Sequence, residues 1–121
     1  LKEGVYLYNP FGHKLENILK EDLSLNIKNA ALGQSFIGDA PINIVITGVY
    51  DRTTSRYGER GKRYVYMEVG HVGQNIYLQA ESLGLGTVVV GAFDDRAIKE
   101  ILNLPQSNEP FYIIPVGNPK N

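Results

Sequence analysis

The sequence predicts a small α/β sandwich, and three patterns carry that prediction. Residues 42–49 are β-branched and nearly all apolar, which is typical of a strand covered on both faces. One apolar helix face recurs over about 60–83 and indicates a long helix, and it consists of Val65, Val69, Val72, Ile76, Ala80 and Leu83. Residues 87–90 and 111–116 have the composition of strands and flank a further helical segment. Alternating strands and helices form layered α/β domains.

Size and composition indicate one domain over residues 1–121. With 121 residues and 43% hydrophobic content, the chain is long enough to bury one hydrophobic core. The formal net charge of -1 gives no basic field for nucleic acid, so we expect no nucleic-acid partner. The sequence has neither an apolar run of the roughly 20 residues that cross a bilayer nor a leader pattern, so we expect a cytoplasmic protein and no membrane partner.

Cysteine and histidine usage restricts the chemistry. The chain has no cysteine, which excludes disulfides, thiolate nucleophiles and cysteine-held clusters within it. His13 and His71 are far apart, and neither has a carboxylate at the spacing of metal ligands. We therefore predict no metal site, and we interpret His71 as a packed or interface histidine.

The first half of the chain predicts a hairpin, a helix and a strand. Residues 5–8 form the first hairpin strand, which turns back through Asn9-Pro10-Phe11-Gly12 into 13–15, because this tetrapeptide suits a type I turn. A short helix begins at Asp22 or Ser24 and ends at Gly33. The strand at 42–49 is expected to be central in the sheet.

A stripe of small residues accompanies the long helix. Gly70 and Gly73 lie beside its apolar face, and each costs the helix about 1 kcal/mol relative to alanine. Their missing side chains either let another backbone or a flat ring approach, or they are a weak point of the helix. Gly84 is expected in the left-handed conformation that ends a helix, with Leu85 making the accompanying contact.

The C-terminal third predicts a second helix and a last strand. Asp94 is the expected N-cap of a helix that reaches about residue 102, and Phe93 is placed to pack on Ile98. The strand at 111–116 contains Pro115, which lacks a backbone N–H, so we expect that part of the strand at an edge or a bulge.

Five segments resemble a known family in the right order. Tyr-Gly-Glu-Arg-Gly-Lys-Arg-Tyr at 57–64, followed by 68–78, resembles the centre of SagB-type dehydrogenases, a branch of the FMN-dependent nitroreductase-like superfamily. Ala-Glu-Ser-Leu-Gly-Leu-Gly-Thr at 80–87, Gly-Ala-Phe-Asp-Asp at 91–95 and Pro-Val-Gly-Asn-Pro at 115–119 resemble its later landmarks. The resemblance covers essentially the whole chain.

This resemblance implies an α+β nitroreductase-like fold, in which a long central helix lies at a homodimer interface and FMN is bound between subunits. The amides of Gly91 and Ala92 would face the N5/O4 edge of the flavin, whereas the plainer alternative is a glycine that ends a strand. Gln74 or Asn75 would hydrogen-bond near the flavin. Lys120 stands where the family often has a phosphate contact, although lysines near a chain end are usually solvated.

The resemblance also points to one catalytic residue, Tyr57. Azoline-oxidising relatives use a Lys-Tyr pair as base and proton relay, and here the corresponding pair reads Arg56-Tyr57. Arginine stays protonated and cannot act as the base, which leaves Tyr57 as a relay. Generic flavin redox chemistry is therefore favoured over azole formation.

Four arginines recur at helical spacing before and within the long helix: Arg52, Arg56, Arg60 and Arg63. On one helix they would form a positive face for a phosphate of FMN or of a nicotinamide donor. The neighbouring acidic residues favour surface or intersubunit salt bridges instead, and they are Asp51, Glu59 and Glu68.

Two functions remain open at this point. The first is an FMN-dependent oxidoreductase that transfers hydride between an NAD(P)H donor, or an organic small-molecule substrate, and an acceptor. The alternative is a catalytically degenerate relative that acts as a dimeric flavin-binding or structural scaffold. The chain begins at Leu1 without the family's N-terminal FMN-phosphate helix, so we expect a truncated domain. An arginine-rich helix upstream in the native gene would favour the enzyme.

Overall fold

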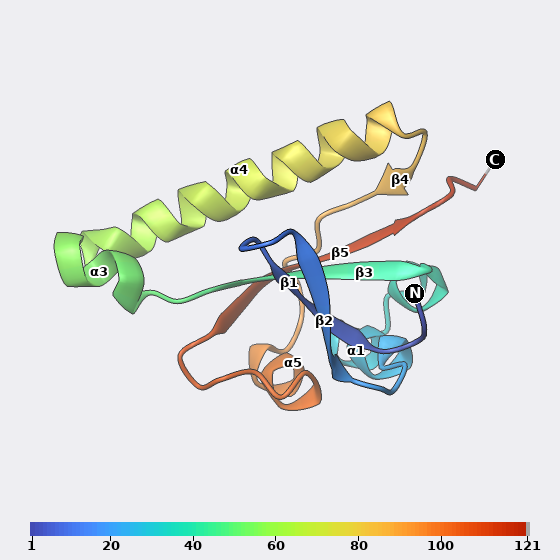
Figure 1. Cartoon of the computed structure of the whole chain (residues 1–121), viewed down its shortest axis with the longest axis horizontal. Helices are drawn as coiled ribbons and strands as arrows, with labels where there is room; N and C mark the ends of the chain where they lie inside the picture. The colour runs from blue at the N-terminus through green and yellow to red at the C-terminus, as the bar shows by residue number, and fades with distance from the viewer. Residues whose placement is uncertain (121) are drawn as a thin grey trace.

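A computed structural model describes residues 1–120 of the chain. Figure 1 shows the long helix α4 on one side of a small sheet and the short helices α1 and α5 on the other side. The elements are, in chain order, β1 (Val5–Asn9), β2 (Lys14–Leu19), α1 (Ser24–Ala30), α2 (Ser35–Asp39), β3 (Ile42–Gly48), α3 (Asp51–Tyr57), α4 (Arg60–Ser82), β4 (Gly86–Thr87), α5 (Asp95–Ile101) and β5 (Glu109–Gly117).

The main sheet is antiparallel, with strand order β3-β5-β4. The prediction that the strand at 42–49 is central is wrong, because β3 lies at an edge and β5 lies in the middle. The residues of β3 after Ile42 are half-buried, as expected for a strand with a layer on each face. A run of apolar residues reports the burial of these faces and carries no information about neighbours within the plane of the sheet.

Pro115 lies in the central strand, whereas the sequence predicts an edge or a bulge at this position. Ile113, two residues earlier, exchanges two backbone hydrogen bonds with Val90, so the nitrogen of Pro115 also faces the β4 side. Pairing on that side stops at Thr87 and resumes at Val90, and the Thr87 hydroxyl donates to the Pro115 carbonyl at 2.7 Å. The missing N–H therefore falls where the ladder is interrupted.

The core lies between the sheet and the short helices. Its buried side chains are Ile27, Ala31, Ile37, Val90, Ile98, Leu102 and Ile113. The predicted helix ending at Gly33 is confirmed as α1, and Gly33 has φ +71°. The N-cap prediction is also confirmed, because the Asp94 carboxylate accepts from the Ala97 amide at 3.0 Å. Phe93 packs against the core that contains Ile98, whereas α2 was not predicted.

Helix α4 agrees with its predicted length, and its cap is confirmed. Gly84 has φ +70°, and the Leu85 amide donates to the Ala80 carbonyl at 2.9 Å, as in a Schellman motif. The buried face is rotated from the predicted one, since Val72 and Leu83 are 40% and 62% exposed. Gly73 is buried next to Val72, so the chain packs through the glycine rather than through the valine.

The predicted hairpin is confirmed and is longer than expected. β1 and β2 pair antiparallel from Asn9↔Lys14 back to Val5↔Leu19. The Asn9 side chain accepts from the Phe11 amide at 2.9 Å and stabilises the turn. Within residues 1–120, no helix has the length and apolar content that crossing a membrane requires.

Candidate functional site

A cleft of about 250 Å³ opens between the first turns of α4, the start of β5 and the segment that leads into α5. Its lining is mainly aromatic and acidic and consists of Tyr50, Tyr66, Gly91, Phe93, Asp95, Glu109, Pro110 and Phe111. These residues come from both halves of the chain, and the antiparallel sheet brings them together.

Three rings form the aromatic wall of the cleft. The ring centroids of Tyr50, Tyr66 and Phe111 lie 5.7 to 6.0 Å apart, and each pair of ring planes meets at 80° to 90°. Gly48 makes room for this wall, because a Cβ there would lie 2.5 Å from the ring of Phe111. The glycine at the end of β3 thus lets Phe111 pack against the strand backbone.

The two tyrosines of the wall are joined through their hydroxyls. Tyr50 donates to the Tyr66 oxygen at 3.0 Å. Burial raises the pKa of Tyr50, and the hydrogen bond with Tyr66 and the nearby carboxylates of Glu109 and Asp95 raise it further. The Tyr50 phenol therefore stays protonated at neutral pH, so it can donate a proton but is not a base.

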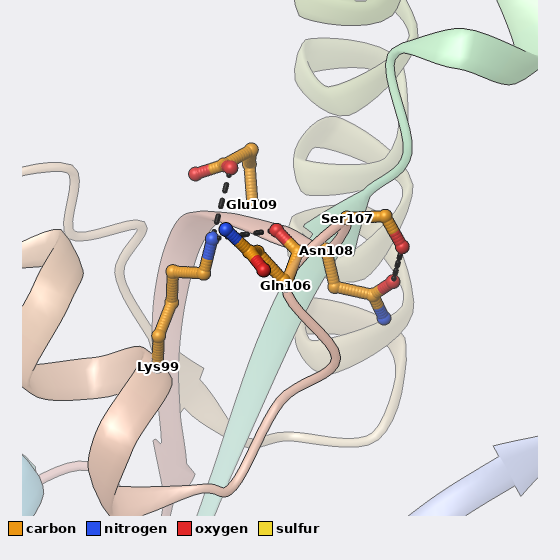
Figure 2. Close-up of polar contacts among 5 residues, drawn as sticks. All are labelled: Lys99, Gln106, Ser107, Asn108 and Glu109. Atoms are coloured by element: carbon orange, nitrogen blue, oxygen red, sulfur yellow. Dashed lines mark hydrogen bonds and ion pairs between the residues drawn. The ribbon is translucent and has the colours of Figure 1, made fainter.

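The two carboxylates of the cleft differ in their partners. Glu109 pairs with Lys99 of α5 at 3.0 Å, and Lys99 also donates to the Gln106 carbonyl at 2.9 Å, as Figure 2 shows. Asp95 has no cation within ion-pair distance among residues 1–120. The negative charge of the cleft therefore rests mainly on Asp95.

Gly91 and Ala92 are exposed at one side of the cleft. No acceptor within residues 1–120 takes a hydrogen bond from either amide. The segment is nonetheless held at both ends, because Val90 pairs with Ile113 and the Asp94 amide donates to the Ala30 carbonyl at 2.9 Å. A Cβ on Gly91 would meet nothing closer than the Tyr112 ring at 3.9 Å. The segment therefore carries two backbone donors without a partner among residues 1–120, on exposed residues that are held at both ends.

The other predicted site residues lie outside this cleft. Tyr57 ends α3, is half exposed, and packs its ring against Tyr64 with the Arg56 guanidinium 5.3 Å from its centroid. Gln74 and Asn75 are exposed on α4. Lys120 pairs with Asp39 at 3.3 Å beyond the far end of β5. Of the predicted set, Gly91 alone lines the cleft.

The arginines do not share one helix face. Gly58, with φ +63°, separates α3 from α4, so Arg52 and Arg56 lie on one helix and Arg60 and Arg63 on the other. The prediction of surface salt bridges within the chain is also wrong, because none of the four arginines pairs with an acidic residue in the described part. Intersubunit salt bridges stay a prediction. Arg60 instead donates to the Tyr64 hydroxyl at 3.1 Å.

Sequence reasoning missed most of the cleft. Asp95 belongs to the 91–95 landmark but had no predicted role, and Tyr50, Tyr66, Glu109 and Phe111 were not predicted as site residues. These residues meet through tertiary packing, which a local pattern does not report. Residues 1–120 contain no group of three or more side chains arranged to hold a metal ion.

Comparison with known proteins assigns the family. Residues 4–118 match the model of the Nitroreductase family. A Methanocaldococcus jannaschii protein named as a nitroreductase, MJ1384, is 53% identical over 117 residues, which cover 97% of this chain and 58% of that protein. The microcin B17-processing protein McbC of Escherichia coli is 27% identical over 104 residues, which cover 85% of this chain and 38% of McbC.

Solved structures agree with these matches. A structure from Anabaena variabilis, assigned to the nitroreductases, superposes with a TM-score of 0.92 at 32% identity and covers 99% of this chain and 25% of that one. The chain thus spans little more than half of its curated relative from M. jannaschii. Because the family model covers nearly the whole sequence and the fold is shared, the chain belongs to the nitroreductase family.

Proposed function

We propose that this chain is part of an FMN-dependent oxidoreductase that transfers hydride between a nicotinamide donor, or an organic substrate, and an acceptor. The observation that carries the proposal is that Gly91 and Ala92 are exposed and that their amides have no acceptor among residues 1–120. Flavin supplies a two-electron carrier whose reduced form holds negative charge near N1 and C4, and backbone donors stabilise such charge without titrating.

The residues around Gly91 fit the edge of a planar ring. Glycine leaves its own backbone accessible, and the nearest atom to a Cβ there is 3.9 Å away. The Val90–Ile113 pairing and the Asp94–Ala30 hydrogen bond keep the two amides from turning to other acceptors. A ring edge with an acceptor oxygen would therefore meet donors that need no reorganisation.

The phosphate of FMN would lie away from the acidic cleft, because Asp95 and Glu109 repel it. Lys120 is the cation that we assign to it. Its ammonium is exposed and held by a surface ion pair with Asp39, which is weak enough to exchange for a phosphate. Gln74 and Asn75 lie on the solvent side of α4 and would reach the flavin from a second subunit.

A homodimer through α4 is part of the proposal. Several large apolar side chains of α4 and its C-terminal cap are exposed, namely Met67, Val72, Leu78 and Leu83. Exposed apolar side chains that gather in one area mark an interface, and we assign this role to the solvent side of α4. We assign the chain to the SagB-type branch, with Tyr57 as a proton relay, and the 57–78 motif and the similarity to McbC support this assignment.

Flavin binding tests the proposal directly. The chain is titrated with FMN and with riboflavin, which lacks the phosphate, and the quenching of flavin fluorescence is followed. We expect both to bind, and we expect Gly91→Val to weaken both at least about tenfold, because a branched side chain covers the amides. Gly91→Ala is the matched control, since one methyl group meets no close neighbour.

Gel filtration and circular dichroism accompany each titration. A folded chain that binds neither flavin, or a Gly91→Val variant that binds as the parent does, would contradict the proposal and favour a structural scaffold. Binding of FMN but not of riboflavin would show that the phosphate contact dominates, and Lys120→Gln should then remove most of the affinity. A dimer that dissociates when Leu78 becomes glutamate would support the α4 interface.

A further inference from the structure

We propose that the aromatic cleft beside Gly91 binds a small organic ammonium cation. On the proposed function, to which this adds a substrate class, the enzyme would favour small molecules that carry a methylated or substituted ammonium group. The binding site itself needs no flavin, because its walls are side chains of the described residues.

The orientation of the rings is the first argument. The planes of Tyr50, Tyr66 and Phe111 are nearly perpendicular to one another in every pair. Three mutually perpendicular planes cannot all be edge-on to the same direction, so the plane of at least one ring is turned toward a ligand in the cleft. A ring face attracts a cation within about 6 Å of its centroid.

The distribution of charge is the second argument. Glu109 is neutralised by Lys99, and Lys62 is neutralised by Glu59 at 3.0 Å. Asp95 is left without a cation of this chain within ion-pair distance in the described part. The cleft therefore carries about one excess negative charge, which favours a cationic ligand over a neutral or anionic one.

The protein already shows the same attraction at the rim of the cleft. The ammonium of Lys62 lies 5.8 Å from the centre of the Tyr50 ring. Its exposed position makes this a weak contact. A ligand cation deeper in the cleft would use the rings of Tyr66 and Phe111 together with Asp95, so it would not have to displace Lys62.

The volume of the cleft restricts the size of the ligand. About 250 Å³ is below the roughly 300–1,000 Å³ of pockets for drug-sized ligands. The cleft is therefore too small for a dinucleotide and suits a group of the size of trimethylammonium.

A matched pair of ligands tests the proposal on the full chain without flavin. Choline and 3,3-dimethyl-1-butanol have nearly the same shape, and only choline is charged. Isothermal titration calorimetry should give choline an affinity at least about tenfold higher. Equal affinities for the two ligands, or no heat from either, would overturn the proposal.

Variants separate the roles of charge and ring. Asp95→Asn should lower the affinity for choline about threefold or more and leave dimethylbutanol unchanged. Glu81→Gln removes one charge from the last turn of α4, outside the cleft and outside every ion pair of the described residues, and should change neither. Tyr66→Leu should weaken choline binding, whereas Tyr66→Phe should keep it, because the ring and not the hydroxyl carries the contact. An equal loss in the two Tyr66 variants would overturn the role of the ring.

The outcome is independent of the flavin titration. Choline binding without flavin binding would support the cation site and contradict the proposed oxidoreductase function. Flavin binding without a preference for choline would support the oxidoreductase function and contradict the proposed cation site.

Discussion

The packed and the open side of α4 use glycine in different ways. Gly61 and Gly73 are buried, and a Cβ would lie 3.0 Å from the backbone of α3 at Gly61 and 3.2 Å from Tyr112 and Val89 at Gly73. At Gly70 a Cβ would meet nothing within 4 Å. Two glycines thus bring elements of this chain together, and the third leaves a space that this chain does not fill.

This difference divides the predicted glycine stripe into two features. The close approach expected at Gly73 is made by the Tyr112 ring and by Val89, whose amide also donates to the Tyr77 hydroxyl at 2.9 Å. Gly70 fits the proposed dimer or flavin contact better, because nothing within residues 1–120 explains the cost of a glycine there. Substitutions on the two sides should therefore differ in sign.

Gly61→Ala should have the largest effect. The new methyl group meets the carbonyl carbon of Thr53 and the Cα of Thr54, and these backbone atoms cannot move without shifting α3. Overpacking costs about 1–3 kcal/mol and exceeds the helix-propensity gain of about 1 kcal/mol. Urea denaturation should show a lower free energy of unfolding. An unchanged or higher value would mean that α3 does not pack closely on α4.

Gly70→Ala should have the opposite sign. With no neighbour within 4 Å, the substitution should raise the free energy of unfolding of the monomer by up to about 1 kcal/mol. The same variant should weaken dimer formation or FMN binding if Gly70 faces a partner. Urea denaturation at low protein concentration and sedimentation at high concentration measure the two effects. Destabilisation of the monomer would show that Gly70 is packed after all.

Gly73→Ala should be nearly neutral, with a loss under about 1 kcal/mol, because the Tyr112 and Val89 side chains can each shift by a few tenths of an ångström. The loss should turn into a gain in a Tyr112→Leu background, where the ring no longer blocks the methyl group. A double-mutant cycle by urea denaturation measures this coupling. Additive effects of the two substitutions would argue against contact between them.

Glu59→Gln should have the smallest effect, since it removes an exposed ion pair with Lys62. The hydrogen bond and charge of Glu59 raise the pKa of Lys62. A raised lysine pKa stabilises the fold below the unfolded pKa, and the contribution disappears as the pH rises through the folded pKa. Thermal unfolding of parent and variant should therefore coincide in alkaline solution and differ little at neutral pH. A gap that widens with pH would contradict this assignment.

Only part of the candidate site could be predicted from the sequence. Gly91 was predicted from the family motif and lies in the cleft, and its flavin contact stays a prediction. Tyr50, Asp95 and Phe111 were not predicted as site residues, because they lie at or near the start of three different elements and share no sequence spacing. Their proximity depends on β3 and β5 pairing antiparallel, so that Gly48 lies opposite Glu109.

The sequence by itself determined the local structure and the family. The Gly84 cap, the Asp94 N-cap, the hairpin turn and the length of α4 each depend on residues a few positions apart, so the local pattern specifies them. The tertiary structure decided which strand is central, which face of α4 is buried and which side chains form the cleft. These depend on contacts between distant segments, and neither helical nor strand periodicity records which segment becomes the neighbour.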